Sequence, residues 1–306
     1  MIEFVEKPEE EIDPFEQYYA DNIVPLVDEE NKVKTRYRSK FWGYLFSVLF
    51  LMSANVLIVL FNSLMHKTPI SWSQLVLINV IALSFVYLPI YRYNKMSKND
   101  IFDVFLKFYG NWQHLKNSEV KLVHSSIIPE HDAVGSTHNV RGNFGDKTME
   151  IRDTYYTKKN KVVSQGVILY ATFDKKFKGS LLMFEKGGFY RKNKFPNYEL
   201  YNGKTDIPAA NYFNIFTSND EIGENILHSL FFENLLDLKD VFKAHHLYLQ
   251  AEDNYMRIYL EGSSLYIDNY KIWSRKIDKN RFLQMHNEFE KIELFMQTIQ
   301  SLMDEK

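Results

Sequence analysis

Carboxylates are the first side chains in this 306-residue chain that could take part in catalysis. Asp220, Glu221 and Glu224 gather at the expected start of a helix, and Asp174 follows an expected strand. The positive end of a helix dipole already favours acidic residues in the first turn, so capping accounts for the group without catalysis. A turn accounts for Asp174. These carboxylates predict no active site.

Histidines at a regular spacing are the second candidate. His124, His131 and His138 are seven residues apart, but Pro129 and Gly135 interrupt the continuous helix that would align them. We therefore expect three loop histidines and no metal site. Cysteine is absent, which excludes disulfides, thiolate metal sites and cysteine nucleophiles.

Short catalytic motifs are missing as well. The chain has no G-x-x-x-x-G-K-[ST] loop, no H-E-x-x-H pair and no G-x-S-x-G elbow. No cofactor is indicated, and we expect a protein that binds rather than catalyses. A motif search does not detect a site assembled from distant residues, so an unrecognised enzyme site in residues 100–306 stays an alternative.

Positive charge is concentrated in one segment. Residues 150–194 contain eleven Lys or Arg and four Asp or Glu. A solvated strand face is one explanation, and the alternatives are a surface for anionic headgroups or for the acidic segment 1–31. We expect no nucleic-acid partner, because no such motif is visible. The candidate binding surface consists of Arg152, Lys158, Lys159, Lys161, Lys175, Lys176, Lys178 and Lys192.

Two long apolar runs precede the basic segment and decide where in the cell it is placed. Residues 41–65 and 68–91 contain no Asp, Glu, Lys, Arg or His, and each exceeds the roughly 20 residues that cross a bilayer core. A transmembrane helical hairpin is predicted. Five bases lie in residues 32–40, others follow Tyr91, and the loop between has only Lys67. The positive-inside rule therefore predicts that both termini are cytoplasmic, in a cell (inner) membrane protein with two helices.

The apolar runs favour an anchor over a transport path, because ion paths usually need ionisable groups within the bilayer. Asn55 and Asn79 are expected to hydrogen-bond between helices, and Gly43 and Ser47 to allow close packing of the hairpin or of a second copy. A small oligomeric channel remains the weaker alternative. The partners implied are the lipid bilayer, and a protein partner or self-association.

The remaining segments complete the expected domain organisation. It comprises an acidic then basic cytoplasmic tail (1–40), a first transmembrane helix (41–65), a short external loop (66–69), a second transmembrane helix (70–91), a juxtamembrane amphipathic helix (92–118) and a cytoplasmic α+β domain (119–306).

Within the domain, the juxtamembrane helix is expected to start at Ser97 and to continue through Leu115. Pro and Gly residues predict loops over 119–147, and alternating patterns predict antiparallel strands from 149 to 270. Ser218 and Glu221 form a capping box before a helix. A last helix from about Ser274 carries an apolar stripe that indicates core packing or, alternatively, a coiled coil. The fold class is therefore α+β, with helices packed on an antiparallel sheet.

The order of these features resembles a known family. The segments that carry the resemblance are LYATFDKKFKGSLLMFEK, FNIFTSNDEIGENIL, FFENLLDL and MRIYLEGSSLYIDN. They are similar to an uncharacterised bacterial family of two-helix membrane proteins that carry domain of unknown function 3137. The matching phrases are Phe173-Asp174, Phe177-Lys178-Gly179 and Phe213 to Asp220, and the chain departs from the family at residues 221–225. The resemblance implies an architecture and a membrane location, but no activity.

Overall fold

The computed structural model divides the chain into two compact units. The helical unit comprises residues 1–104 and 268–278, and the sheet domain comprises residues 105–267 and 279–306. The fold class is α+β, with a long apolar helix near the N-terminus and a large antiparallel sheet. The structure describes residues 13–66, 72–96, 100–115, 125–144, 147–189, 197–201, 207–265, 273, 277 and 279–304.

The helical unit begins with a capped helix. α1 (Pro14–Tyr18) starts after Asp13, whose carboxylate accepts a hydrogen bond from the Phe15 amide at 2.9 Å. A π-helical turn, η1 (Tyr19–Ile23), leads into α2 (Val24–His66). A stripe of apolar side chains at four-residue spacing is buried along these elements: Phe15, Tyr19, Ile23 and Val27. The described part of the acidic segment, from Pro14, and the basic segment of residues 32–40 therefore lie in helices.

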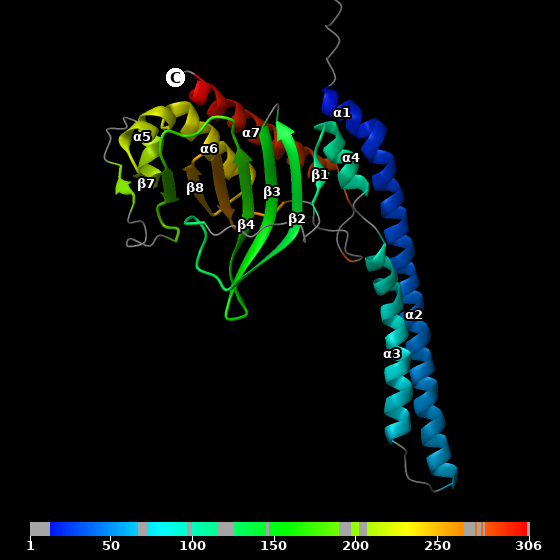
Figure 1. The fold of residues 1–306 in the computed structure, drawn as a ribbon. Coiled ribbons are helices and arrows are strands. Elements are labelled where there is room, and N and C mark those ends of the chain that lie inside the picture. Colours follow the sequence, from blue (N-terminus) through cyan, green and yellow to red (C-terminus); the bar gives the residue numbers. More distant parts are fainter. Residues whose placement is uncertain are drawn as a thin grey trace, which may run out of the picture. The chain divides into compact units, whose positions relative to one another are not determined.

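α2 is apolar over its second half. It runs for 43 residues, and α3 (Trp72–Lys95) lies beside it (Figure 1). Among the described side chains, the helix over Pro14–His66 is the one that is long and apolar enough to cross a membrane, and its most apolar 18-residue window is only 6% buried. Gln74, Leu75 and Ile78 of α3 lie outside the described side chains, so α3 is covered only in part.

The helix that follows is shorter than the sequence predicts. α4 (Asp100–Phe108) ends seven residues before Leu115, and Gly110 has a φ of +86°. Glycine adopts this backbone conformation without steric cost, so the chain turns there and leaves the helix. Trp112 and Leu115 are buried outside the helix, next to the short strand β1 (Gln113–His114). Ser97, the expected cap, lies outside the described residues.

The described strands of the sheet domain form one antiparallel sheet in the order β1-β2-β3-β4-β9-β8-β5-β7-β6. Three long strands make a meander at one side (Figure 1). The strands after β1 are β2 (Ala133–Phe144), β3 (Lys147–Lys158), β4 (Lys161–Thr172), β5 (Leu181–Glu185), β6 (Glu199–Leu200), β7 (Phe213–Thr217), β8 (His246–Glu252) and β9 (Tyr255–Glu261).

The prediction of loops over residues 119–147 is wrong for β2. Gly135 and Gly142 lie inside this strand, and each leaves room for an aromatic ring. A Cβ atom at Gly142 would overlap the Trp112 ring, and one at Gly135 would overlap the Tyr155 ring. Glycine in a strand often marks such a close approach rather than a turn.

Three helices cover one face of the sheet (Figure 1): α5 (Asp220–Ile226), α6 (Ser229–Val241) and α7 (Lys279–Asp304). The stripe on α7 is core, because Met285, Phe289 and Ile292 are all at most 5% exposed. The helix expected after the capping box at Ser218 and Glu221 is two helices, α5 and α6. Its cap is Asn219 rather than Ser218, since Asn219 accepts from the Ile222 amide at 3.2 Å. A 3₁₀ turn, η3 (Pro208–Tyr212), precedes β7.

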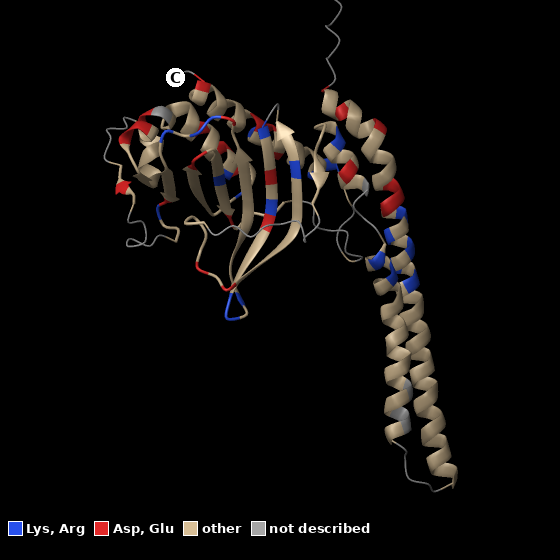
Figure 2. Cartoon of the chain, viewed as in Figure 1, with Lys and Arg blue, Asp and Glu red and all other residues tan. Residues whose placement is uncertain are grey.

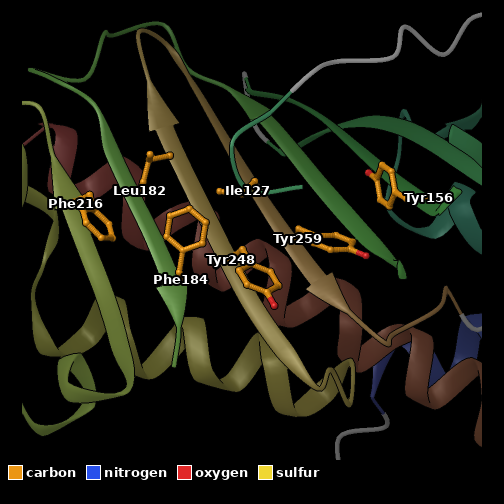
Figure 3. Packing of buried hydrophobic residues seen from close by; sticks show 7 residues of the cluster. All are labelled: Ile127, Tyr156, Leu182, Phe184, Phe216, Tyr248 and Tyr259. Atoms are coloured by element: carbon orange, nitrogen blue, oxygen red, sulfur yellow. The ribbon is translucent and has the colours of Figure 1, made fainter. Parts of the chain in front are cut away.

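The opposite face of the sheet carries an aromatic cluster. Figure 3 shows the seven side chains on the strands and on the connection before β2. They are Ile127, Tyr156, Leu182, Phe184, Phe216, Tyr248 and Tyr259. Partly buried residues of connecting segments, among them Ile128, Phe189 and Tyr198, pack against the cluster. Loops rather than helices therefore help to close this side of the core.

The close approach at Gly142 gives a test of β2. We expect Gly142→Ala to lower the free energy of unfolding by about 1–3 kcal/mol, because the added methyl group overpacks the Trp112 ring. Thr137→Ala, at the exposed bulge of the same strand, should change it by less than about 0.5 kcal/mol. Chemical denaturation of the purified chain, followed by circular dichroism, measures both values. Equal losses in the two variants would contradict the placement of Gly142.

Candidate functional site

The basic segment of the sequence lies on β3, on β4 and in the loop after β4, but Arg152 is not part of its surface. The Arg152 side chain is 13% exposed and pairs with the Glu150 carboxylate, which Arg141 contacts as well. Burial alone would raise the pKa of Glu150, but the hydrogen bonds from both guanidinium groups more than offset it, so this pKa lies below its ordinary value. Arg152 therefore neutralises a buried carboxylate within the sheet.

Three of the lysines lie at the tip of the β3–β4 hairpin. The turn at Lys159 and Asn160 has positive φ at both residues, which is typical of a tight two-residue hairpin turn. We call Lys158, Lys159 and Lys161 the tip cluster. Behind the turn, Lys158 pairs with Glu130 at 2.9 Å, and Asp132 accepts from the Lys159 amide at 2.7 Å. Three lysines against two carboxylates leave the tip with a net positive charge.

Apolar side chains are exposed beside the tip cluster. Val162 is 60% exposed, Val163 44% and Tyr155 39%. The pairing of β3 with β4 shifts by one residue after Tyr156, so Val163 is the extra residue of a β-bulge. The bulge explains why two consecutive valines are both exposed, although neighbouring residues of a regular strand point to opposite faces.

A second group of lysines lies at the other end of β4. We call Lys175, Lys176 and Lys178 the loop cluster, because they follow this strand on the loop to β5. Figure 2 shows the two basic groups at opposite ends of the long strands. β4 has twelve residues, which at ~3.3 Å per residue puts roughly 36 Å between its ends. The described lysines of the candidate binding surface thus form two groups rather than one, and Lys192 lies outside the described residues.

The predicted helix-packing residues separate into two pairs. Asn55 on α2 and Asn79 on α3 come together, with the Asn55 amide nitrogen 3.5 Å from the Asn79 side-chain oxygen. Gly43 and Ser47 are exposed on α2, and a Cβ atom at Gly43 would meet no atom within 4 Å. The glycine therefore makes no close contact with the described residues.

A polar pocket of about 430 Å³ is the described site that most resembles an active site. At one wall, the Glu261 carboxylate accepts hydrogen bonds from Tyr248 at 2.8 Å and Ser164 at 2.9 Å, and Ser164 is 2.5 Å from the Tyr259 hydroxyl. Burial raises the pKa of both tyrosines, so they stay protonated and neutral near pH 7. Its lining residues are Ser164, Gln165, Gly187, Gly188, Phe189, His245, His246, Glu261 and Gly262.

This network was not expected from the sequence, because its members lie on three different strands. Both Glu261 oxygens are already hydrogen-bonded, so the carboxylate is held as an acceptor within the sheet. Within the described part of the chain, no group of three His, Asp or Glu residues is placed to hold a metal ion. His131, one of the three spaced histidines, is 2.8 Å from the Pro129 carbonyl, and His124 lies outside the described residues.

A second carboxylate is buried beneath the sheet. Glu288 on α7 is 1% exposed; Gln284 donates to one oxygen at 3.1 Å, and the other oxygen has no hydrogen-bond partner among the described residues. Burial raises the pKa of Glu288 to about 8, against the attraction of Lys243. The folded protein therefore keeps Glu288 protonated at neutral pH, whereas the unfolded chain releases the proton near pH 4.5.

This difference predicts how stability depends on pH. The folded pKa of Glu288 is raised, so the group lowers the free energy of unfolding progressively between about pH 4.5 and pH 8. Glu288→Gln should match the unsubstituted protein near pH 4.5 and be more stable at pH 8.5, by a few kcal/mol as an order of magnitude. Thermal unfolding across this range measures the difference, with Glu293→Gln on the same helix as the control. A constant difference at all pH values would contradict the assignment.

Comparisons with known proteins find a family that part of this chain is similar to. No curated protein matches the sequence at a significant level. Among solved structures, the crystal structure of the mycobacterial trehalose monomycolate transport factor A, TtfA, aligns with a TM-score of 0.35 and 10% identity, over 63% of this chain and 91% of that one. A TM-score of this size does not show a shared fold. Residues 163–303 match the family described as "Protein of unknown function (DUF3137)". This match confirms, for residues 163–303, the resemblance found in the sequence.

Proposed function

We propose that this protein is a membrane-anchored module that acts by binding rather than by catalysis. In this proposal α2 and α3 cross the cell (inner) membrane as a hairpin, and the sheet domain lies on the cytoplasmic side. The tip cluster then binds an anionic membrane surface. The small oligomeric channel is not favoured, because both apolar runs lack ionisable residues.

The observation that carries the proposal is the apolar surface of α2. The helix has large apolar side chains that are more than half exposed, and its most apolar window has a mean hydropathy of 2.3. Such a surface would be unfavourable in water at about 25 cal/mol per Å² and is favourable in a bilayer. The most exposed side chains on α2 are Phe46, Phe50, Leu51, Leu57, Ile58, Phe61, Leu64 and Met65.

The distribution of charge on the helical unit supports two spans and their orientation. At ~1.5 Å per residue, α2 is roughly 64 Å long, about twice the hydrocarbon thickness, so its basic part extends beyond the apolar part. In Figure 2 the bases of α2 and the bases at the end of α3 lie side by side. The bases of both helices thus lie at the same end of their apolar parts, which the positive-inside rule assigns to the cytoplasm.

Aromatic rings mark the same level of the helical unit. Trp273 packs edge-on against Phe41, with ring centroids 4.8 Å apart, and lies 6.3 Å from the Trp42 ring. Both tryptophans are 49% exposed. Tryptophan is enriched where a membrane meets water, and Phe41 and Trp42 directly follow the bases of residues 32–40. This arrangement supports a membrane boundary near Phe41.

The tip cluster suits an anionic bilayer because it combines two features. Lysines near an anionic bilayer contribute about 1 kcal/mol each, and exposed apolar side chains can enter the headgroup region. Lys159 and Lys161 have no ion-pair partner among the described residues, and Val162 lies beside them. Exposed apolar groups next to basic ones are typical of an interaction surface.

Cysteine labelling tests the orientation, because the natural chain has no cysteine. We expect His66→Cys, at the end of α2, to react with a membrane-impermeant maleimide in intact cells. Ser301→Cys, on α7 of the sheet domain, should react only after the cells are permeabilised. Both variants should stay in the membrane pellet after alkaline carbonate extraction. Labelling of Ser301→Cys in intact cells, or release of the protein by carbonate, would overturn the proposal.

Charge reversal tests the role of the tip cluster. The full chain is reconstituted in nanodiscs of zwitterionic lipid and mixed with vesicles that contain an anionic phospholipid. The variant with Lys158→Glu, Lys159→Glu and Lys161→Glu should bind these vesicles about 100-fold or more weakly, since three lysines contribute roughly 3 kcal/mol.

The matched control reverses Lys175, Lys176 and Lys178 to Glu, at the other end of β4. This control should retain vesicle binding, because it changes the net charge by the same amount without touching the tip. Equal losses in the two variants would show that only total charge matters, and retained binding in the tip variant would refute the tip cluster.

A further inference from the structure

The loop cluster borders a cleft of about 230 Å³ whose floor is apolar. Ile222 and Ile226 of α5 are 1% and 3% exposed, and Phe177 is 8% exposed. Leu302 and Met303, from the last turn of α7, complete the floor, while the three lysines line the rim. All of these residues belong to the sheet domain. Positive charge and an apolar surface thus occur in one cavity.

Hydrogen bonds of the loop fix the shape of this cleft. The Phe177 amide donates to the Asp253 carbonyl at 2.5 Å, and its ring packs edge-on against Phe173 with centroids 5.4 Å apart. Asn219, which caps α5, also donates its side-chain amide to the Lys178 carbonyl at 2.9 Å. The loop and the helix that line the cleft are therefore tied to each other in the folded domain.

Two of the three rim lysines form exposed ion pairs. Lys175 bonds to Asp304 at 2.6 Å and to the Met303 carbonyl at 3.4 Å, near the C-terminus of α7. Lys178 pairs with Glu221 at 2.9 Å. Both lysine side chains are more than half exposed, and such pairs contribute about 0–1 kcal/mol. Lys176 has no ion-pair partner among the described residues, so an incoming anion displaces little.

We infer that this cleft binds a fatty-acid anion, with the carboxylate at the lysines and the first methylene groups on the apolar floor. A site for a bare anion would not need Ile222, Ile226 and Met303 beneath it, and a site for a neutral apolar group would not need three lysines. The small cavity admits one chain rather than the two chains of a bilayer phospholipid. This inference goes beyond the proposed function, because it uses the loop cluster instead of the tip cluster.

Photo-crosslinking tests the site directly. The probe is octanoate with a diazirine at the end of its chain, added to the full protein in nanodiscs of zwitterionic lipid. We expect cross-links on α5 or on the last turn of α7, identified by mass spectrometry of the peptides. Unlabelled octanoate should compete with the probe, whereas octanol and acetate, which lack either the charge or the chain, should not.

Charge variants complete the test. Reversal of Lys175, Lys176 and Lys178 to Glu should lower cross-linking at the cleft about tenfold or more, since a repulsive rim replaces an attractive one. Reversal of Lys158, Lys159 and Lys161 should leave it unchanged, with circular dichroism as the check that both variants fold. Cross-links confined to α2 and α3, or equal competition by octanol or acetate, would overturn the inference. Cysteine labelling reports on the anchor independently, so the two ideas can fail separately.

Discussion

The apolar surface of α2 is the constraint on which the remaining structure depends. A helix satisfies its own backbone hydrogen bonds, so it can lie in hydrocarbon without unpaired polar groups, whereas exposed Phe and Leu side chains are unfavourable in water. The surface of α2 combines these two properties over its second half. Among the described residues, the Asp, Glu, Lys and Arg side chains of α2 and α3 lie on one side of the apolar parts, where Asn31 and Tyr93 pair with backbone and carboxylate groups. In the proposed membrane arrangement, the bilayer accounts for the positions of this unit that carry charge.

The sheet domain is stabilised by a hydrophobic core on each face of its sheet, and the two faces are covered by different elements. One face is covered by helices, and a buried hydrogen bond of 2.7 Å joins Asn234 on α6 to Thr298 on α7. The other face carries tyrosine and phenylalanine rings that bury much of their own area. Tyr248 and Tyr259 stack there with centroids 5.9 Å apart, and their hydroxyl groups bond to Glu261 and Ser164. Loops can close this face because the polar ends of the rings are already paired.

The sequence predicts those features that depend on residues close together in the chain, and it misses those that depend on contacts between distant residues. The strands β3 and β4 and the buried stripe of α7 follow from local periodicity. β2 was missed because Gly135 and Gly142 resemble loop residues until the aromatic rings opposite them are known. Arg152 was assigned to the surface because its partner Glu150 lies on the same strand and only burial shows that the pair is inside. The two lysine clusters could not be separated without the length and direction of β4.

Asn219 has a consequence for how the domain responds to its surroundings. One side chain holds both the first turn of α5 and the carbonyl of Lys178. The loop that carries the loop cluster therefore cannot move far without also releasing the helix cap. Loss of such a cap typically lowers stability by about 1 kcal/mol. The cleft between this loop and α5 is preorganised, because folding of the domain already orders both. A ligand that enters the cleft therefore causes a smaller loss of conformational entropy.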